Sequence, residues 1–253
     1  MIKFFRKIRQ NLLSEGKTTK YFKYAIGEII LVVIGILIAL SINTWNEERK
    51  EKAIVRNLLK NIRYDLVADT TEFSRLIQKI PKELKNSKML LNSTALDTLS
   101  ANALWYKLPY TPYESMIKNQ SYEKVINAGI TDFFEFNELF DDINTYYTID
   151  SNVYNTGRKW NDDETDADGV LWKTMGFEID IYPIKGFYKQ NEIEFAQTEA
   201  TRKALFLEQI NLPTVRNSIK MNMYRKMFLN DILNKTKQKA KDIILKIDTQ
   251  LKE

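Results

Sequence analysis

The chain has 253 residues and a net charge of +5, and its 44% hydrophobic and 12% aromatic content is typical of a folded protein. It contains no cysteine and no histidine, which excludes disulfides, thiolate nucleophiles, Cys/His zinc sites and histidine bases. The basic excess belongs to residues 1–45, where Glu15 and Glu28 are the only acids beside seven lysines and arginines. The rest of the chain is neutral, so a nucleic-acid partner is not expected.

Residues 1–23 form a basic arm. Ile2, Phe5, Ile8 and Leu12 recur at spacings of three and four, which is typical of an amphipathic helix on a membrane surface. A plain signal-anchor head explains the same pattern. The residues expected to attract anionic lipid headgroups are Lys3, Arg6, Lys7 and Arg9.

Residues 24–45 are predicted to be a transmembrane helix. The stretch AIGEIILVVIGILIALSIN lies between Tyr24 and Trp45, and about 20 apolar residues suffice to cross a bilayer. Lysines and arginines are almost equally frequent before and after it. A short basic head before the first apolar run usually stays in the cytoplasm, so we expect a cytoplasmic N-terminus.

One face of this span carries a candidate helix–helix interface. Gly35 and Ala39 form a pair of small residues four apart, which permits close approach of a second membrane helix. Glu28 and Ile42 share their face, and Glu28 is the only charge inside the span. We expect a homo-oligomer or a membrane-protein partner here. Contact of Glu28 with lysines near the membrane surface is the alternative.

Residues 46–253 are predicted to be a helical domain. Ile54, Leu58, Ile62 and Leu66 recur every four residues, and the stripe continues to Pro81, which is expected to end or kink the helix. A last helix is expected from residue 213 to residue 251. Its seam consists of Ala240, Ile244, Ile247 and Leu251. The first and last long helices are expected to pair antiparallel.

The middle of the chain predicts shorter elements. Helices are expected over residues 113–128 and 137–148, the first ending at Gly129 and the second burying Leu139, Ile143 and Tyr147. Residues 150–190 are expected to be an irregular, loop-rich insert with one strand through Phe177, Ile179 and Ile181. Helical spacing returns over residues 193–207. The predicted fold class is therefore mostly α: one N-terminal transmembrane helix that continues into an elongated helical bundle.

An acidic run, DDETDADG, covers residues 162–169. With Glu164 as first ligand, Asp166 and Asp168 fall at the third and fifth positions of a calcium loop, but Met175 stands where the bidentate Glu belongs. A solvated acidic loop is the preferred interpretation, and a looser calcium site or calcium-stabilised binding domain is the alternative. No other metal site and no cofactor are expected.

The N-terminal segments MIKFFRKIRQ and YAIGEIILVVIGILIALSINTWNEERK resemble a family of short single-span membrane proteins of Bacteroidota that is known as a domain of unknown function. The resemblance covers about the first 60 residues, and a weaker likeness extends over residues 122–129 and the C-terminal helix. It implies a location in the inner (cytoplasmic) membrane, with the large domain in the periplasm. It implies no catalytic residue.

The sequence therefore favours a membrane-tethered periplasmic interaction module that acts as an accessory subunit, scaffold or sensor, without catalysis. The alternative is an envelope enzyme that uses carboxylates, such as a glycan hydrolase. Aromatic residues gather between residues 105 and 147. We interpret them as core residues, although the lining of a ligand pocket is an alternative.

Overall fold

The structure is a computed structural model that describes residues 18–109, 112–180, 189 and 192–252. The chain divides into two compact units, Met1–Asn57 and Leu58–Glu253. The described residues are mainly helical and contain no β-strand, so the prediction of a mostly α fold is confirmed.

Helix α2, Thr18–Leu91, supplies all the described residues of the first unit and the first element of the second. From Phe22 onward it is long and apolar enough to cross a membrane. Its most apolar stretch of 18 residues has a mean hydropathy of 2.8, and none of that stretch is buried. A helix satisfies its backbone hydrogen bonds internally, so this segment needs no neighbour to complete them.

Past Asn57, α2 presents a regular seam of buried positions spaced by three and four residues, the repeat of a coiled coil. The seam consists of Leu59, Ile62, Leu66, Asp69, Phe73, Leu76, Ile80, the largely buried Glu83, Ser87 and Leu90. Ile54 is exposed, so the predicted stripe is shifted by one residue there. Pro81, which was expected to end or kink the helix, lies inside α2, so the helix does not end there. The proline is exposed, and the buried Ile80 and Leu90 hold the helix on both sides of it.

Helix α8, Pro213–Gln250, carries the matching seam. It begins at a proline, which is favoured in a first turn because its missing N–H would be unpaired there anyway. The seam consists of the buried positions Val215, Ile219, Asn222, Lys226, Leu229, Leu233, Thr236, Ala240, Ile243 and Ile247. Ile243 takes the place predicted for Ile244, and the final helix is otherwise as expected from the sequence.

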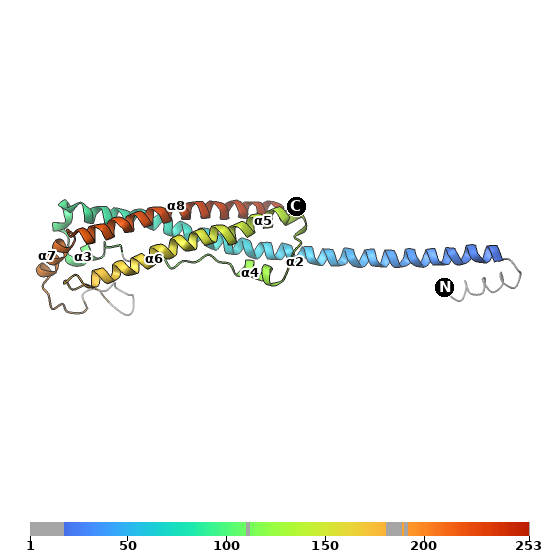
Figure 1. Ribbon diagram of the computed structural model, residues 1–253, viewed down its shortest axis with the longest axis horizontal. Helices are drawn as coiled ribbons and strands as arrows, with labels where there is room; N and C mark the ends of the chain where they lie inside the picture. The colour runs from blue at the N-terminus through green and yellow to red at the C-terminus, as the bar shows by residue number, and fades with distance from the viewer. Residues whose placement is uncertain (1–17, 110–111, 181–188, 190–191, 253) are drawn as a thin grey trace. The chain divides into compact units, whose positions relative to one another are not determined.

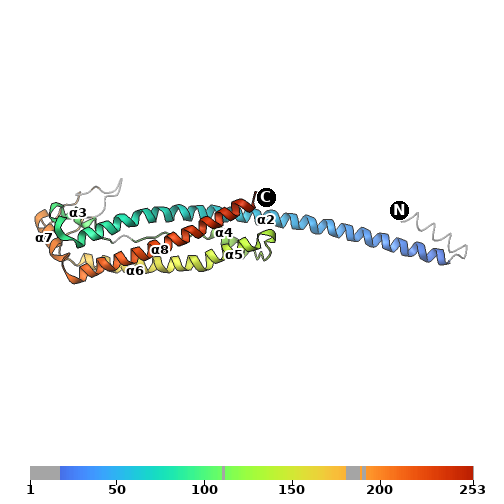
Figure 2. The ribbon, with the colours of Figure 1, turned by 90° about the horizontal axis from the view of Figure 1, so that it is seen from above.

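The two seams pair antiparallel. Arg63 binds Asp248 with its Nε 2.5 Å from Oδ1, and further along α2 the carboxylate of Glu83 lies 2.8 Å from Nζ of Lys226. Near the end of α2, the carbonyl of Leu91 accepts a hydrogen bond of 2.9 Å from Arg216. Residue numbers thus fall along α8 as they rise along α2, which confirms the predicted pairing. The two views show this part of α2 beside α8 (Figures 1 and 2).

Helix α6, Ser151–Lys173, packs on α8 and occupies much of the segment predicted to be an irregular insert. That prediction is wrong for residues 151–173. Its buried positions include Gly157, Asn161 and Thr165, which are small or polar, so the apolar period that signals a helix is missing. A Cβ on Gly157 would lie 2.7 Å from Cδ1 of Ile232. The glycine therefore allows α6 and α8 to approach closely.

A continuous run of helix leads into α6. It comprises α5, Asn137–Thr145, and a π-helical turn, η3, Tyr146–Asp150. Leu139, Ile143 and Tyr147 are buried as predicted. The π turn inserts two adjacent tyrosines into the core, with the Tyr146 and Tyr147 rings 5.0 Å apart and perpendicular.

Before α5, the helix predicted over residues 113–128 is reduced to α4, Gln120–Asn127. The prediction is wrong for residues 113–119, where a side chain of α2 binds the backbone instead: the Lys118 amide donates to Asp69 (2.9 Å). The Ser121 amide, in the first turn of α4, donates to Asp65 (3.0 Å). Gly129 has a φ of 65°, the left-handed conformation expected after α4. A short 3₁₀ turn, η2, Phe134–Phe136, follows.

The 3₁₀ turn η1, Ser93–Thr98, leads from α2 to α3, Ala101–Trp105, and α7, Glu199–Gln209, precedes α8. Figures 1 and 2 show α3 and α7 at one end of the second unit and α4, α5 and the C-terminus at the other. The helix predicted over residues 193–207 starts only at Glu199, because the Thr198 hydroxyl accepts from the Thr201 amide and caps it.

Between α6 and α7, the described residues of the segment 174–198 form neither helix nor strand. The predicted strand is wrong for Phe177 and Ile179, while Ile181 lies outside the described residues. The Glu178 amide donates to the Gln197 side chain over 2.8 Å, so a side chain takes the place of a neighbouring strand. The Phe177 ring packs 5.2 Å from that of Phe206.

Substitutions at two glycines of α6 are expected to change the stability of the fold in opposite directions. Gly157→Leu is expected to lower the free energy of unfolding by about 1–3 kcal/mol, because the new side chain overlaps Ile232. At Gly169 an added Cβ meets no atom within 4 Å. Gly169→Ala is therefore expected to raise stability by up to about 1 kcal/mol through helix propensity. Denaturant titration of the full chain in detergent measures both, and equal effects of the two substitutions would contradict this packing.

Candidate functional site

The predicted interface residues of the span all lie in α2. Glu28, Gly35, Ala39 and Ile42 occupy one face because residues seven apart on a helix differ by only about 20° in direction. An added Cβ at Gly35 would meet no atom within 4 Å, so this position is open on the helix surface. A side chain that begins there meets no neighbour among the described residues at its first atom. The basic arm with Lys3, Arg6, Lys7 and Arg9 lies outside the described residues.

The acidic run lies in α6 and is not a loop. Asp168 accepts hydrogen bonds from the Ser218 hydroxyl (2.5 Å) and from Arg225 (2.8 Å). Glu164 lies 3.7 Å from the same arginine, and Asp166 is exposed. The interpretation as a calcium loop or a solvated loop is wrong, because a helix spreads these side chains around its axis. Among the described residues, no group of three or more acidic side chains is placed to hold a metal ion.

An apolar groove of about 340 Å³ lies between α6 and α8. Its walls include Val153, Gly157, Trp160 and Phe228. The indole of Trp160 contacts the rings of Phe228 and Tyr224 edge-on, with centroids 5.9 and 6.1 Å apart. Exposed apolar residues extend this surface, namely Met221, Tyr224 and Met227. Aromatic and methionine side chains of this kind are enriched in protein–protein interfaces.

Asp69 occupies a seam position of α2 and is only 2% exposed. Its carboxylate accepts from the Lys118 amide at 2.9 Å and from the Tyr146 hydroxyl at 3.0 Å. Burial raises the pKa of Asp69 to about 7, although both hydrogen bonds act in the opposite direction. The pKa of Tyr146 is raised as well, first by burial and then by the charge of Asp69. This carboxyl group therefore titrates near neutral pH inside the bundle.

A second set of charged residues links α2 and α8 across the seam. Lys226 is 1% exposed, and its Nζ lies 2.8 Å from Glu83. The same carboxylate accepts from the Tyr113 hydroxyl and lies 3.2 Å from Nζ of Lys79. Burial tends to raise the pKa of Glu83, but the charge and hydrogen bond of Lys226 outweigh it and the pKa lies below its usual value. Burial lowers the pKa of Lys226, and Glu83 opposes that shift.

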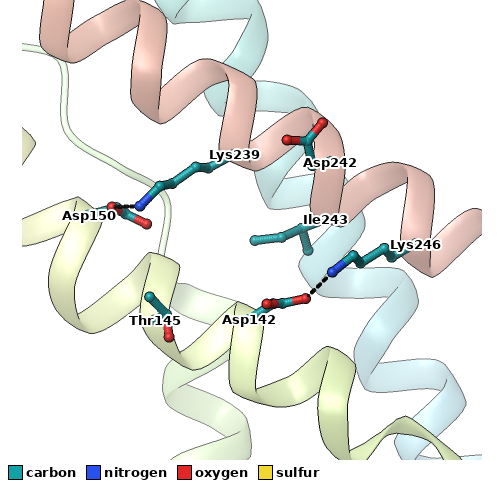
Figure 3. Close-up of a pocket in the computed structure, with 7 residues that line it drawn as sticks. All are labelled: Asp142, Thr145, Asp150, Lys239, Asp242, Ile243 and Lys246. Carbon is teal, nitrogen blue, oxygen red and sulfur yellow. Dashed lines mark hydrogen bonds and ion pairs between the residues drawn. The ribbon is translucent and has the colours of Figure 1, made fainter.

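A groove of about 240 Å³ between α8 and the α5–η3 segment contains three carboxylates and two lysines. Figure 3 shows its two ion pairs: Asp142 lies 2.5 Å from Lys246, and Asp150 binds Lys239. Asp242 accepts from Gln238 on the same helix at 2.8 Å. These ion pairs connect α8 to the neighbouring helices.

The buried charges Asp69, Glu83 and Lys226 were not predicted from the sequence. The sequence does carry a signal for them, since each stands at a spacing of three or four residues from its neighbours in a mainly apolar seam. A charged residue at such a position is unusual and indicates a buried partner. The partners themselves could be identified only from the structure. They are the Tyr146 hydroxyl, the Tyr113 hydroxyl and the Lys118 amide.

In the part of the chain that the structure describes, the protein is helical and has one apolar helix long enough to span a membrane. Residues 28–100 of the chain match a family of unknown function (DUF6090), and the match covers less than a third of the chain. It includes the small-residue face of the span and the part of the α2 seam that carries Asp69 and Glu83. No similarity to a curated protein or to a solved structure was found.

The raised pKa of Asp69 predicts a pH-dependent stability. Between about pH 4 and pH 7 the folded chain retains a proton that the unfolded chain releases, so the stability from this group falls as the pH rises. Asp69→Asn removes this dependence. The difference in free energy of unfolding between wild type and variant is expected to fall by roughly 4 kcal/mol across the interval, at ~1.4 kcal/mol per pKa unit.

Denaturant titrations at several pH values across this interval measure the effect. Asp163→Asn is the matched control, because Asp163 is exposed and, within the described part of the chain, its ion pair is with the exposed Lys159. The control should follow the wild type. Parallel curves for wild type and Asp69→Asn would contradict a titrating buried carboxyl group.

Proposed function

We propose that this chain is a membrane-tethered interaction module that serves as an accessory subunit, scaffold or sensor, acting by binding rather than by catalysis. The observation that carries the proposal is the apolar part of α2, with a mean hydropathy of 2.8 and no buried residue in its most apolar stretch. Leaving such a surface in water costs about 25 cal/mol per Å². A bilayer removes that cost over about 20 helical residues.

The proposed location is the inner (cytoplasmic) membrane of a Gram-negative, Bacteroidota-type envelope, with a single pass, a cytoplasmic N-terminus and a periplasmic bundle. The basic head before the span supports this orientation. The likeness of the first 60 residues to single-span envelope proteins supports the compartment. The family match over residues 28–100 includes most of the span but adds no activity.

Two surfaces are proposed to bind partners. Within the membrane, the Glu28–Gly35–Ala39–Ile42 face allows close approach of another helix, of a second copy or of a partner subunit. Outside it, the α6–α8 groove offers the exposed aromatic residues Tyr224 and Phe228 beside Trp160. Contiguous exposed apolar surface of this kind is typical of interaction sites.

The alternative function is an envelope hydrolase with paired carboxylates. Such an enzyme needs two carboxyl groups about 5–9.5 Å apart across a cleft, one to protonate the leaving group and one to act as base or nucleophile. In the groove of Figure 3, Asp142 and Asp150 are each held by a lysine. This arrangement supports binding over hydrolysis.

Membrane anchoring predicts that the full chain stays with the membrane fraction after washing with alkaline carbonate. A variant that lacks residues 25–44 should move to the soluble fraction, because the exposed apolar segment has been removed. Immunoblots of the two fractions measure the outcome. Extraction of the intact chain by carbonate would contradict a spanning helix.

Partner binding predicts that affinity purification from native membranes in mild detergent recovers a stoichiometric partner or a second copy. Gly35→Leu is expected to reduce the recovery several-fold if the contact lies in the membrane, because the open position allows the leucine without harm to the fold. Glu28→Gln tests the same face. The double substitution Tyr224→Ser, Phe228→Ser is expected to reduce the recovery of the partner if the contact lies on the bundle.

Tyr64→Ser is the control, since Tyr64 is an exposed aromatic residue outside both surfaces. Mass spectrometry and a labelled second copy distinguish a partner subunit from self-association. Unchanged recovery in all four surface substitutions would refute both interfaces.

A further inference from the structure

A cavity of about 300 Å³ lies beside the seam between α2 and α8, in a part of the second unit that the proposed function does not use. Its walls come from the last third of α2, from the turn after α3 and from α8. Five of its lining residues are charged, namely Lys79, Lys82, Glu83, Lys107 and Lys226. Four cations thus face a single carboxylate in one small space.

The carboxylate does not neutralise this cavity. One oxygen of Glu83 lies 3.2 Å from Nζ of Lys79 and the other 2.8 Å from Nζ of Lys226, and the Tyr113 hydroxyl donates to it as well. Glu83 is therefore fully engaged by cations and donors. Lys226 lines the cavity but is only 1% exposed, so its charge is held at a fixed place in the wall.

The two remaining lysines are available to a ligand. Lys82 is exposed and Lys107 is half-buried, and neither forms an ion pair with any residue in the described part of the chain. Ammonium groups on flexible stems bind oxyanions by charge-assisted hydrogen bonds. Two such groups at the mouth of one cavity supply donors that the protein itself leaves unused.

Apart from the amide of Asn86, the rest of the wall is mainly apolar, and it limits the size of the ligand. Leu108 and Pro109 are buried, and Tyr106 contributes a half-buried ring. A volume of about 300 Å³ is at the small end of ligand pockets in proteins. A compact molecule with charged groups at one end fits this combination of walls.

We propose that this cavity binds a small oxyanion, a molecule bearing phosphate or carboxylate groups, which Lys82 and Lys107 hold directly while Lys79 and Lys226 supply positive charge from the wall. The site lies within the bundle and is independent of membrane anchoring. Phosphate and carboxylate ligands share this chemistry, and the probes below distinguish them.

The test is isothermal titration of the purified full chain in detergent at low ionic strength, with inorganic phosphate in one series and citrate in another. At least one probe is expected to bind at one site per chain. Lys82→Gln combined with Lys107→Gln is expected to weaken that binding by about tenfold or more. The Lys82→Arg, Lys107→Arg pair, which keeps both charges, should retain most of it.

Lys85→Gln is the matched control, because Lys85 is an exposed lysine of α2 outside the cavity lining. It should change the affinity by less than about twofold. Thermal melts of each variant without ligand separate loss of binding from loss of fold. The proposal fails if neither probe binds saturably, if the double glutamine variant binds as the wild type does, or if Lys85→Gln weakens binding equally.

Discussion

The antiparallel seam between α2 and α8 is the constraint on which the rest of the bundle depends. Both helices present buried positions at spacings of three and four, so one register brings the two apolar stripes together. That register also sets Glu83 opposite Lys226, deep in the seam. A slip of one turn would separate these charges and leave a buried ammonium without a partner, which is costly. The charged pair therefore specifies the alignment that the apolar residues stabilise.

Helix α6 and the segment before α4 are arranged around this seam. The glycine at position 157 allows α6 to lie close to α8 at Ile232, while the π turn directs Tyr146 to Asp69. Asp69 in turn binds the backbone at Lys118, and Asp65 binds the first turn of α4 at Ser121. Asp69 thus holds the end of a stretch of chain that has no regular structure of its own, and it replaces a hydrogen bond that a helix would have supplied.

The long elements could be predicted from the sequence because their signals are local. An uninterrupted apolar run indicates the first part of α2, and Pro213 followed by a heptad pattern indicates α8. Helix α6 could not be predicted, since Gly157, Asn161 and Thr165 face the core and remove the apolar period. The lysine cavity could not be predicted either. Lys82 and Lys107 become neighbours of Lys226 only through tertiary packing.

The pairing of Arg63 with Asp248 places the last turns of α8 beside the part of α2 that enters the second unit. Since α2 enters the second unit at Leu58 and α8 ends at Gln250, the polypeptide begins and ends this unit at the same end. A fluorescent protein or purification tag fused to the C-terminus would therefore project from that end. The opposite end, with α3 and α7, would stay unobstructed, as would the nearby lysine cavity. A reporter fragment that has to lie near α3 and α7 would need to be inserted within the chain rather than fused to its C-terminus.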